Sequence, residues 1–204
     1  MNMLVERVLV ERALMERDRR EAETEAALAA GAGAVIRLSA RMPSGMRRLG
    51  LASNPVARGA AIFECACRDR GLSLRPLGSG DGPLGPWRLW ASGSRPDELK
   101  RTALQVEEDS WLGSLLDLDV IGPEGPVGRA ELCLPSRRCV VCGGTAAECS
   151  GRATHDPKTV EAAFGIILER SRSAVTSGSP DGDAVGVLPP LHIEEIETKG
   201  GDTP

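Results

Sequence analysis

The stretch LLDLDVIGPEG, residues 115–125, has the alternating period of a β-strand and carries two acidic side chains. Its aliphatic residues alternate with Asp117 and Asp119, and successive side chains of a strand point to opposite faces of a sheet. The GPEG segment predicts a tight turn, and residues 127–134, VGRAELCL, predict the returning strand of a hairpin. Because Asp is a poor strand former, two of them on one strand face need a chemical reason.

We expect Asp117 and Asp119 to lie side by side, with their Cα atoms about 7 Å apart. Two carboxylates at this spacing repel each other unless a cation lies between them. Mg²⁺ held by both carboxylates and by substrate phosphate oxygens would remove that repulsion and neutralise charge on a transferred group. The alternative is a strand face on which both aspartates contact water, and Glu107 is either a third oxygen ligand or the end of a charged helix.

Cap and turn signals on either side of this stretch predict the remaining elements. Helices are expected over the first thirty residues, from Asn54 to Gly71, from Pro96 to about Glu108, and after Asp156. Further strands are expected over residues 33–40, 72–77 and 86–92, and the segment rich in Gly and Pro, residues 78–86, predicts a loop. We therefore expect an α+β fold with a mixed, largely antiparallel sheet, one domain over residues 1–172, and a mobile acidic tail over residues 173–204.

The composition is that of a globular protein, with 41% apolar and 26% charged residues among 204. Three Trp, two Phe and no Tyr leave Leu, Val, Ile and Ala to build the core. No run of about 18 apolar residues is present, and the N-terminus lacks the apolar segment of a secretory signal. We expect a cytoplasmic protein that does not bind membranes.

The net charge of −4 conceals two blocks of opposite sign. Residues 37–75 carry eight Arg and two acids, whereas residues 76–128 carry four basic and nine acidic residues. This pattern favours a polyphosphate substrate held with a divalent cation, and the alternative is a pair of solvated faces. Nucleic acid is not an expected partner, because few aromatic residues are available for stacking on bases.

A cysteine-rich segment, RRCVVCGGTAAECSGRATH, occupies residues 137–155. Three thiols and one imidazole suit a tetrahedral Zn²⁺ site, and a closed set of four ligands predicts a structural role. The alternative is a group of small buried side chains with a chance histidine. The proposed ligands are Cys139, Cys142, Cys149 and His155. The other cysteines lie in helix or strand patterns and are predicted to fill the core: Cys65, Cys67 and Cys133.

Two arginine pairs are candidate phosphate ligands, because the guanidinium group presents a fork of donors. Arg137 and Arg138 precede the first cysteine of the cluster, and Arg47 and Arg48 follow a glycine-containing loop. The alternative is that both pairs are simply exposed to solvent.

Taken together, these residues resemble a known family. The run WLGSLLDLDVIGPEG…GRAELCLPSRRCVVCGGTAAECSGRATH, residues 111–155, resembles the holo-citrate lyase synthases, which are apo-citrate lyase phosphoribosyl-dephospho-CoA transferases. That family shows a PLGRLxDIDV…PEG strand and hairpin, followed by LPxRRCLLC…AAxCxRxxTH with the same spacing of Cys and His. RDRR at residues 17–20 and VIRLSARMPSGMRR at residues 35–48 resemble other family motifs more loosely, and Lys100 and Glu107 fall where the family has LKxxTxxLE.

The resemblance implies a nucleotidyltransferase-like fold and a transfer reaction. The phosphoribosyl-dephospho-CoA unit of 2′-(5″-triphosphoribosyl)-3′-dephospho-CoA would be attached to a serine of the citrate lyase acyl carrier protein, with release of diphosphate. Asp117 and Asp119 would be the catalytic residues and the ligands of Mg²⁺. The expected substrate-binding residues are Arg47, Arg48, Lys100, Glu107, Gly113, Arg137 and Arg138.

The sequence departs from the family pattern at two positions next to this site. Ser114 stands where the family has Arg, and Ser110 stands where it often has His. Two alternatives remain open at this point. One is a zinc-stabilised protein-binding module without catalysis, and the other is a related nucleotidyltransferase that acts on a different acyl carrier protein, such as that of malonate decarboxylase.

Overall fold

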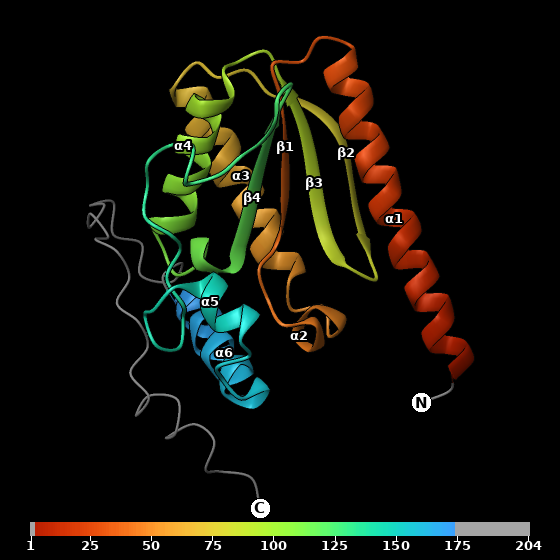
Figure 1. Ribbon diagram of the computed structural model, residues 1–204, viewed down its shortest axis with the longest axis vertical. Helices are drawn as coiled ribbons and strands as arrows, with labels where there is room; N and C mark the ends of the chain where they lie inside the picture. The colour runs from red at the N-terminus through yellow and green to blue at the C-terminus, as the bar shows by residue number, and fades with distance from the viewer. Residues whose placement is uncertain (1–2, 174–204) are drawn as a thin grey trace, which may run out of the picture. The chain divides into compact units, whose positions relative to one another are not determined.

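The computed structural model describes residues 3–173 (Figure 1). The predicted acidic tail therefore lies outside the described residues, apart from its first position. The chain divides into two compact units. The first contains Met1–Val106 and Leu116–Gly128, and the second contains Glu107–Leu115 and the chain from Arg129 onwards.

The first unit is built on a five-stranded sheet with the strand order β2-β3-β1-β4-β5. Every neighbouring pair of strands is antiparallel, which confirms the predicted α+β class; the sheet is therefore wholly antiparallel and not mixed as predicted. The strands are β1 (Ala34–Ala40), β2 (Arg75–Gly82), β3 (Gly85–Ser92), β4 (Leu116–Gly122) and β5 (Gly125–Val127). The central strand β1 pairs with β3 on one side and β4 on the other, so elements distant in sequence become neighbours.

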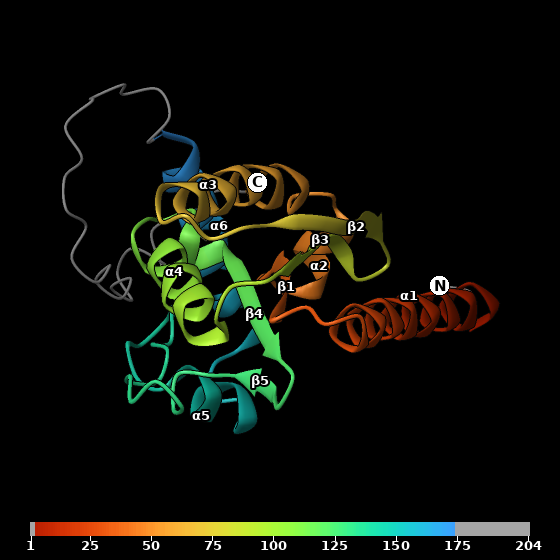
Figure 2. The same ribbon diagram turned by 90° about the horizontal axis from the view of Figure 1, so that it is seen from above.

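Helices cover the two faces of this sheet. Those of the first unit are α1 (Met3–Ala29), α2 (Ser44–Arg48), α3 (Ser53–Asp69) and α4 (Pro96–Glu108), whose last two residues belong to the second unit. The ring of Phe63 on α3 lies 5.7 Å from that of Trp90, on the face that also carries Leu116 and Leu118. Figure 2 shows α1 on the other side of β1 and β4 from α4.

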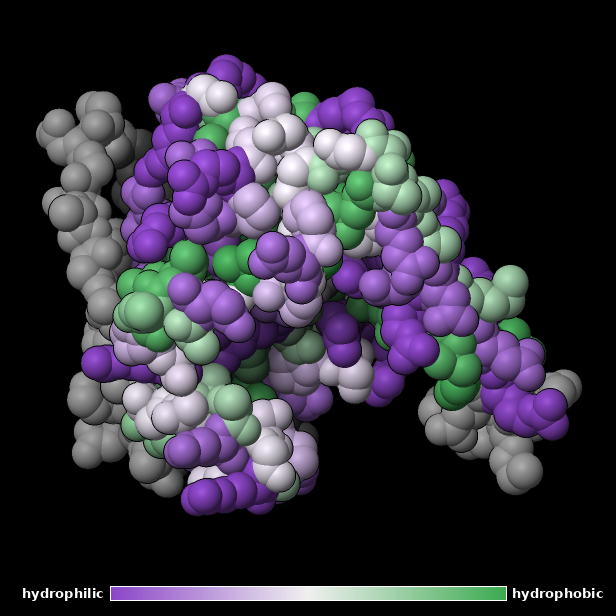
Figure 3. Space-filling model, turned by 45° about the horizontal axis from the view of Figure 1, so that its top comes forward, coloured by the Kyte–Doolittle hydropathy of each residue, from purple (hydrophilic) through white to green (hydrophobic). Residues whose placement is uncertain are grey.

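The face under α1 is apolar over the strands that the helix crosses. Ala27 of α1 packs in a buried cluster with four strand residues: Val35, Trp87, Leu89 and Ala91. Towards its N-terminal end α1 exposes large apolar side chains, which appear green among hydrophilic residues in Figure 3. These side chains are Val8, Leu9, Val10, Leu14 and Met15. None of the helices in the described part of the chain combines the length and apolar character needed to cross a membrane.

The predicted loop over residues 78–86 is wrong, because most of it belongs to the β2–β3 hairpin. Glycine composition suggested a loop, but the reason for the glycines is a tryptophan on the neighbouring strand. A Cβ atom on Gly80 would lie 2.8 Å from Trp87 Nε1, and one on Gly78 would lie 3.4 Å from the same ring. The glycines allow the indole to lie against β2.

The β4–β5 hairpin is confirmed, but the returning strand is shorter than predicted. It ends at Val127, and residues 129–133 form a turn in which Cys133 has a φ of 55°. A non-glycine residue with positive φ does not continue a strand. The prediction of a strand up to residue 134 is therefore wrong beyond Val127.

The second unit contains η1 (Gly113–Leu115), α5 (Ala146–Gly151) and α6 (Pro157–Ser173). Asp156 Oδ2 accepts hydrogen bonds from the backbone N–H groups of Lys158 at 2.9 Å and Thr159 at 3.4 Å, so the predicted helix cap is confirmed. Phe164 of α6 is buried. The Arg170 guanidinium lies 4.6 Å from the centroid of the Trp111 ring, which is a cation–π contact within this unit.

Candidate functional site

Asp117 and Asp119 point to the same face of β4, as their spacing predicts. The β1–β4 register places Ser39 opposite Asp117 and Arg37 opposite Asp119, and directly opposed residues of antiparallel strands share a face. Asp117 is half-buried and Asp119 is exposed. The intervening Leu118 is fully buried on the other face. The carboxylates therefore lie on the accessible side of a strand whose other side forms the core.

A cavity of about 120 Å³ opens beside this carboxylate pair. It is bordered by α1, β1, β3 and β4, all of which belong to the first unit. Arginine residues of a helix and of two strands line this cavity together with one aspartate. The lining residues are Arg17, Arg20, Arg37, Leu38, Ser39, Trp87, Arg88, Leu89 and Asp119.

Two of the guanidinium groups in this cavity are oriented by contacts with other side chains of the first unit. Arg20 lies 5.6 Å from the centroid of the Trp87 ring, and Arg37 Nη1 donates to Glu21 Oε2 at 2.9 Å. Arg37 Nε is buried and has no hydrogen-bond partner among the described residues. An oriented guanidinium with a spare donor suits a phosphate or carboxylate ligand.

Electrostatics in the cavity also favour an anion. Burial lowers the pKa of the Arg20 guanidinium, Glu16 acts in the opposite direction, and the positive charge of Arg37 lowers the pKa further. Arginine remains protonated at neutral pH in spite of such effects. Two positive charges that disfavour each other in a partly buried site would be stabilised by a bound anion.

Sequence reasoning did not select Arg17, Arg20 or Arg37 as site residues. Arg37 is a charged residue within a strand that is otherwise almost entirely buried, and this contrast was available from its apolar neighbours. The RDRR motif at residues 17–20 was noticed only as part of a loose resemblance. Local sequence patterns could not show that a helix near the N-terminus and three strands border one cavity.

Three of the basic residues predicted to bind substrate have other surroundings in the first unit. Arg47 Nη1 donates to the carbonyl oxygen of Leu84 at 3.2 Å, in the β2–β3 turn, and Arg48 is exposed on α2. Lys100 is 7% exposed, and its Nζ donates to the carbonyl oxygen of Leu118 at 2.7 Å. Leu118 is the residue between Asp117 and Asp119, so this contact fixes Lys100 to the backbone of the strand that carries them.

The other predicted substrate-binding residues lie in the second unit. The Glu107 carboxylate is buried and forms ion pairs with Arg137 and Arg129, the latter at 3.7 Å. Gly113 is buried in η1, where its N–H donates to Ser110 Oγ at 3.0 Å. Arg138 is exposed. Because the Glu107 carboxylate is buried, removing a guanidinium partner would leave its charge less compensated, which destabilises a fold.

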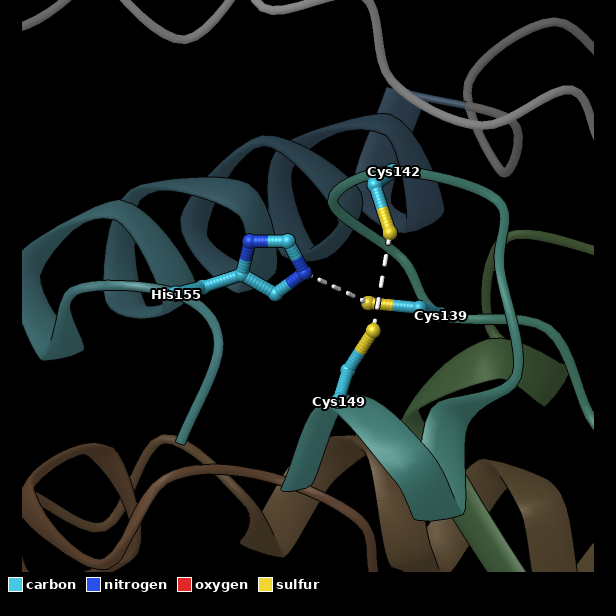
Figure 4. Close-up of side chains that lie close together, drawn as sticks. All are labelled: Cys139, Cys142, Cys149 and His155. Atoms are coloured by element: carbon cyan, nitrogen blue, oxygen red, sulfur yellow. Dashed lines mark hydrogen bonds between the residues drawn. The ribbon is translucent and has the colours of Figure 1, made fainter. Parts of the chain in front are cut away.

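The cysteine-rich segment forms the predicted cluster (Figure 4). Single ligand atoms of Cys139, Cys142, Cys149 and His155 all lie within 4.8 Å of one another. Cys139 Sγ is 3.4 Å from His155 Nε2, and Cys142 Sγ is 3.6 Å from Cys149 Sγ. This group of side chains could hold a metal ion.

The remaining cysteines behave differently from one another. Cys67 is fully buried, as predicted, because it lies on the face of α3 that packs on the sheet. Cys65 and Cys133 are exposed, so the prediction that they fill the core is wrong. Cys65 lies on the outer face of α3, and Cys133 lies in the turn that follows β5.

Comparison with known proteins places these features in a family. A family model described as apo-citrate lyase phosphoribosyl-dephospho-CoA transferase matches residues 8–170. The chain belongs to this family. The part matched by the apo-citrate lyase phosphoribosyl-dephospho-CoA transferase family runs from α1 through the whole sheet to the Cys/His cluster and most of α6.

Individual relatives carry the same name, apo-citrate lyase phosphoribosyl-dephospho-CoA transferase. The protein from Citrobacter koseri is 33% identical over 98 residues, which is 48% of this chain and 54% of the relative. Proteins from Escherichia coli O7:K1 and Shigella boydii serotype 18 are 29% identical over the same length. The chain thus spans about half the length of the curated relatives that it matches.

Proposed function

We propose that the chain transfers the phosphoribosyl-dephospho-CoA unit from 2′-(5″-triphosphoribosyl)-3′-dephospho-CoA to a serine of the citrate lyase acyl carrier protein. The serine oxygen attacks the phosphorus nearest the ribose, the bond from that phosphorus to the leaving diphosphate breaks, and the serine proton passes to a base. We further propose that the sheet is of nucleotidyltransferase type and that the enzyme works in the cytoplasm. Membership of the family supports this proposal.

The single observation that carries the proposal is the pairing of Arg37 with Asp119 at the arginine-lined cavity. A triphosphate needs cationic donors along its length and a way to neutralise the charge that develops on the leaving group. Arg17, Arg20 and Arg37 supply the donors on one side of the cavity. Asp117 and Asp119 supply carboxylates on the neighbouring strand.

The aspartate pair fits Mg²⁺ that arrives with the substrate. Proteins usually bind this ion through one or two carboxylates and complete its shell with phosphate oxygens and water. In the described residues, the Cys/His cluster is the one group of three or more His, Cys, Asp or Glu side chains close enough to share an ion, so the pair alone supplies only part of a shell. When bound, the ion would neutralise charge on the transferred phosphoryl group and on diphosphate.

Residues chosen from sequence receive different proposed roles. Arg48 and Arg138 are exposed and remain proposed contacts for outer parts of the substrate. Arg47 and Lys100 are proposed to act indirectly, because they hold the β2–β3 turn and the β4 backbone. In the second unit Glu107 and Arg137 form an ion pair, and Gly113 lies in η1, so we propose that they support the substrate site through the local backbone.

The direct test is to incubate the purified chain with the triphosphoribosyl substrate, Mg²⁺ and the apo form of the citrate lyase acyl carrier protein. We expect the intact mass of the carrier to rise by one phosphoribosyl-dephospho-CoA unit, with one diphosphate released for each carrier modified. A carrier in which the acceptor serine is replaced by alanine is the control and should stay unmodified.

The same experiment separates the alternatives. Modification of a malonate decarboxylase carrier and not of the citrate lyase carrier would favour a related transferase over this proposal. Binding of the carrier without diphosphate release would favour a binding module without catalysis. Failure to modify either carrier under conditions in which a known transferase is active would overturn the proposed reaction.

A further inference from the structure

All four ligand atoms of the Cys/His cluster lie within 4.8 Å of one another, and two of their separations are close to those of ligands that share one metal ion. Tetrahedral Zn²⁺ with Zn–S bonds near 2.3 Å and Zn–N bonds near 2.0 Å places a sulfur and a nitrogen about 3.5 Å apart and two sulfurs about 3.8 Å apart. The distance of 3.4 Å between Cys139 Sγ and His155 Nε2 and the distance of 3.6 Å between Cys142 Sγ and Cys149 Sγ are close to these values. In Figure 4 the four side chains converge from different directions.

The backbone around the first two cysteines is folded into a tight turn that presents both sulfurs. The Gly143 N–H donates to the carbonyl oxygen of Cys139 at 2.9 Å, and the Cys139 N–H donates to the carbonyl oxygen of Gly144 at 2.6 Å. Gly143 has a φ of +74°, which side chains with a Cβ rarely adopt. The turn therefore depends on glycine directly after Cys142.

This segment has almost no hydrophobic core to hold it. In residues 135–156 the structure buries only Cys139 and Val141, and α5 buries no side chain at all. A segment that buries so little apolar surface does not offset the entropy of ordering its backbone. In small metal-binding units, the free energy of metal binding offsets the entropy lost when the backbone is ordered, so the unit folds only with its ion bound.

We propose that Cys139, Cys142, Cys149 and His155 bind one Zn²⁺ and that this ion orders residues 137–155, including the side chain of Arg137. The ion joins the turn at Cys139 to α5, through Cys149, and to the entry of α6, through His155. Four protein ligands leave no open position for substrate, so the site is structural. The observations that support this site include neither the carboxylate pair nor the proposed transfer reaction.

Backbone hydrogen bonds connect Arg137 to the part of the chain that carries the Cys/His cluster. The carbonyl oxygen of Arg137 accepts a hydrogen bond from the N–H of Ala146 at 2.9 Å, and Arg138 forms a β-bridge with Thr145. The Arg137 guanidinium is paired with the buried Glu107 carboxylate. Zn²⁺ thus holds the strand segment from which Arg137 reaches the carboxylate.

The first test measures metal in the full-length chain, expressed with zinc and purified under reducing conditions without chelator. We expect one Zn²⁺ per chain by elemental mass spectrometry. Cys142→Ser and His155→Ala should each lower the zinc content at least tenfold, and His155→Cys, which supplies another good ligand, should restore it. Cys65→Ser and Cys133→Ser are matched controls and should keep one Zn²⁺ per chain.

The second test is limited trypsin digestion before and after chelation. We expect chelation to raise the rate of cleavage after Arg137, Arg138 and Arg152 at least tenfold, and to leave cleavage after the exposed Arg48 of the first unit unchanged. Zinc added back should restore protection. These readouts do not depend on catalysis, so they can fail or succeed separately from the proposed function.

Three outcomes would overturn the inference. A wild-type chain with less than one tenth of a Zn²⁺ per molecule after incubation with zinc would exclude the site. A mass lower by two hydrogens together with a Cys142–Cys149 crosslinked peptide would show a disulfide in its place. Unchanged trypsin cleavage after chelation of a zinc-loaded chain would exclude the ordering role.

Discussion

Arg37 of β1 and Asp119 of β4 lie directly opposite each other on the sheet face that borders the arginine-lined cavity. The next pair along the same face is Ser39 and Asp117. The register thus places a basic and an acidic residue on one sheet face, and the Arg37 guanidinium itself donates to Glu21 Oε2 of α1 at 2.9 Å. This arrangement is the basis of the first two predictions.

Replacing the aspartates should stop transfer and leave the fold intact. Asp117→Asn and Asp119→Asn should each slow modification of the carrier by at least about 100-fold, because each removes charge that would hold the cation at the phosphates. Asp119 is exposed, so its replacement should change the free energy of unfolding by no more than about 0.5 kcal/mol. The measurements are intact-mass kinetics of the carrier and urea unfolding.

Glu124→Gln is the control for this pair, because it neutralises an exposed carboxylate in the β4–β5 turn. It should keep wild-type activity. Full activity of both aspartate variants with Mg²⁺ would show that the carboxylate pair has no part in catalysis.

Removing the Arg37 charge should weaken binding of the triphosphate. Arg37→Gln should raise the KM or the Kd for the triphosphoribosyl substrate by about 10–100-fold, which is the size of effect expected for a hydrogen bond to a charged group. Arg68→Gln on the outer surface of α3 is a matched control and should bind like the wild type. Equal affinities of the two variants, measured by calorimetry, would remove Arg37 from the substrate site.

A methyl group on Gly80 should destabilise the β2–β3 hairpin. The added Cβ would lie 2.8 Å from Trp87 Nε1, and the rigid indole has to move. We expect Gly80→Ala to lower the free energy of unfolding by about 1–3 kcal/mol. Gly93→Ala, at a position where an added Cβ meets no atom within 4 Å, should change it far less.

A double mutant tests whether the Trp87 ring causes this loss of stability. In the background of Trp87→Leu, the added methyl of Gly80→Ala should cost much less, because the ring that it would meet is gone. The same cost in both backgrounds, from urea unfolding curves, would assign the effect to backbone entropy rather than to the ring contact.

The Cys67 thiol should resist modification and make stability depend on pH in alkaline solution. Burial raises the pKa of this thiol from its ordinary value of 9.0 to about 11. The folded state thus favours the protonated thiol. The resulting stabilisation is fully present below pH 9 and is lost as the pH rises through about 11.

This pH dependence can be measured in two ways. The free energy of unfolding should fall more steeply between pH 9 and pH 11 in the wild type than in Cys67→Ala. At pH 8, mass spectrometry of alkylated peptides should show exposed Cys65 and Cys133 labelled first, with Cys67 labelled only in denaturant. Labelling of Cys67 at the rate of Cys65 in the native protein would contradict its burial.

Local sequence patterns predicted the helices and strands whose formation depends on residues that are close in sequence. The alternation around Asp117 identified β4 and the face that the aspartates share, and Asp156 marked the start of α6. The predicted strand over residues 72–77 covers only the start of β2, because the glycines in the rest of β2 are explained by a ring on β3 and not by their own neighbours. Composition alone reads such a segment as a loop.

In the candidate site, too, some residues could be predicted from local spacing, whereas others depend on how distant elements pack. The aspartates and the cysteine cluster follow from short-range spacing, so sequence reasoning could name them. Arg20 and Arg37 reach the cavity only through the packing of α1 on the sheet and the register of β1 against β4. Lys100 was selected by resemblance, and its contact with the Leu118 carbonyl became visible only when α4 and β4 were in place.

The strand order has a consequence for how the protein matures in the cell. Strand β1 emerges early from the ribosome, but its partner β4 follows only after the β2–β3 hairpin and α4 have been synthesised. Pairings between segments so far apart form slowly, because a long loop has to close first. Arg37 of β1 and Asp119 of β4 therefore reach opposed positions only late in synthesis. A nascent chain that ends before β4 lacks both aspartates, and we expect it not to modify a carrier protein.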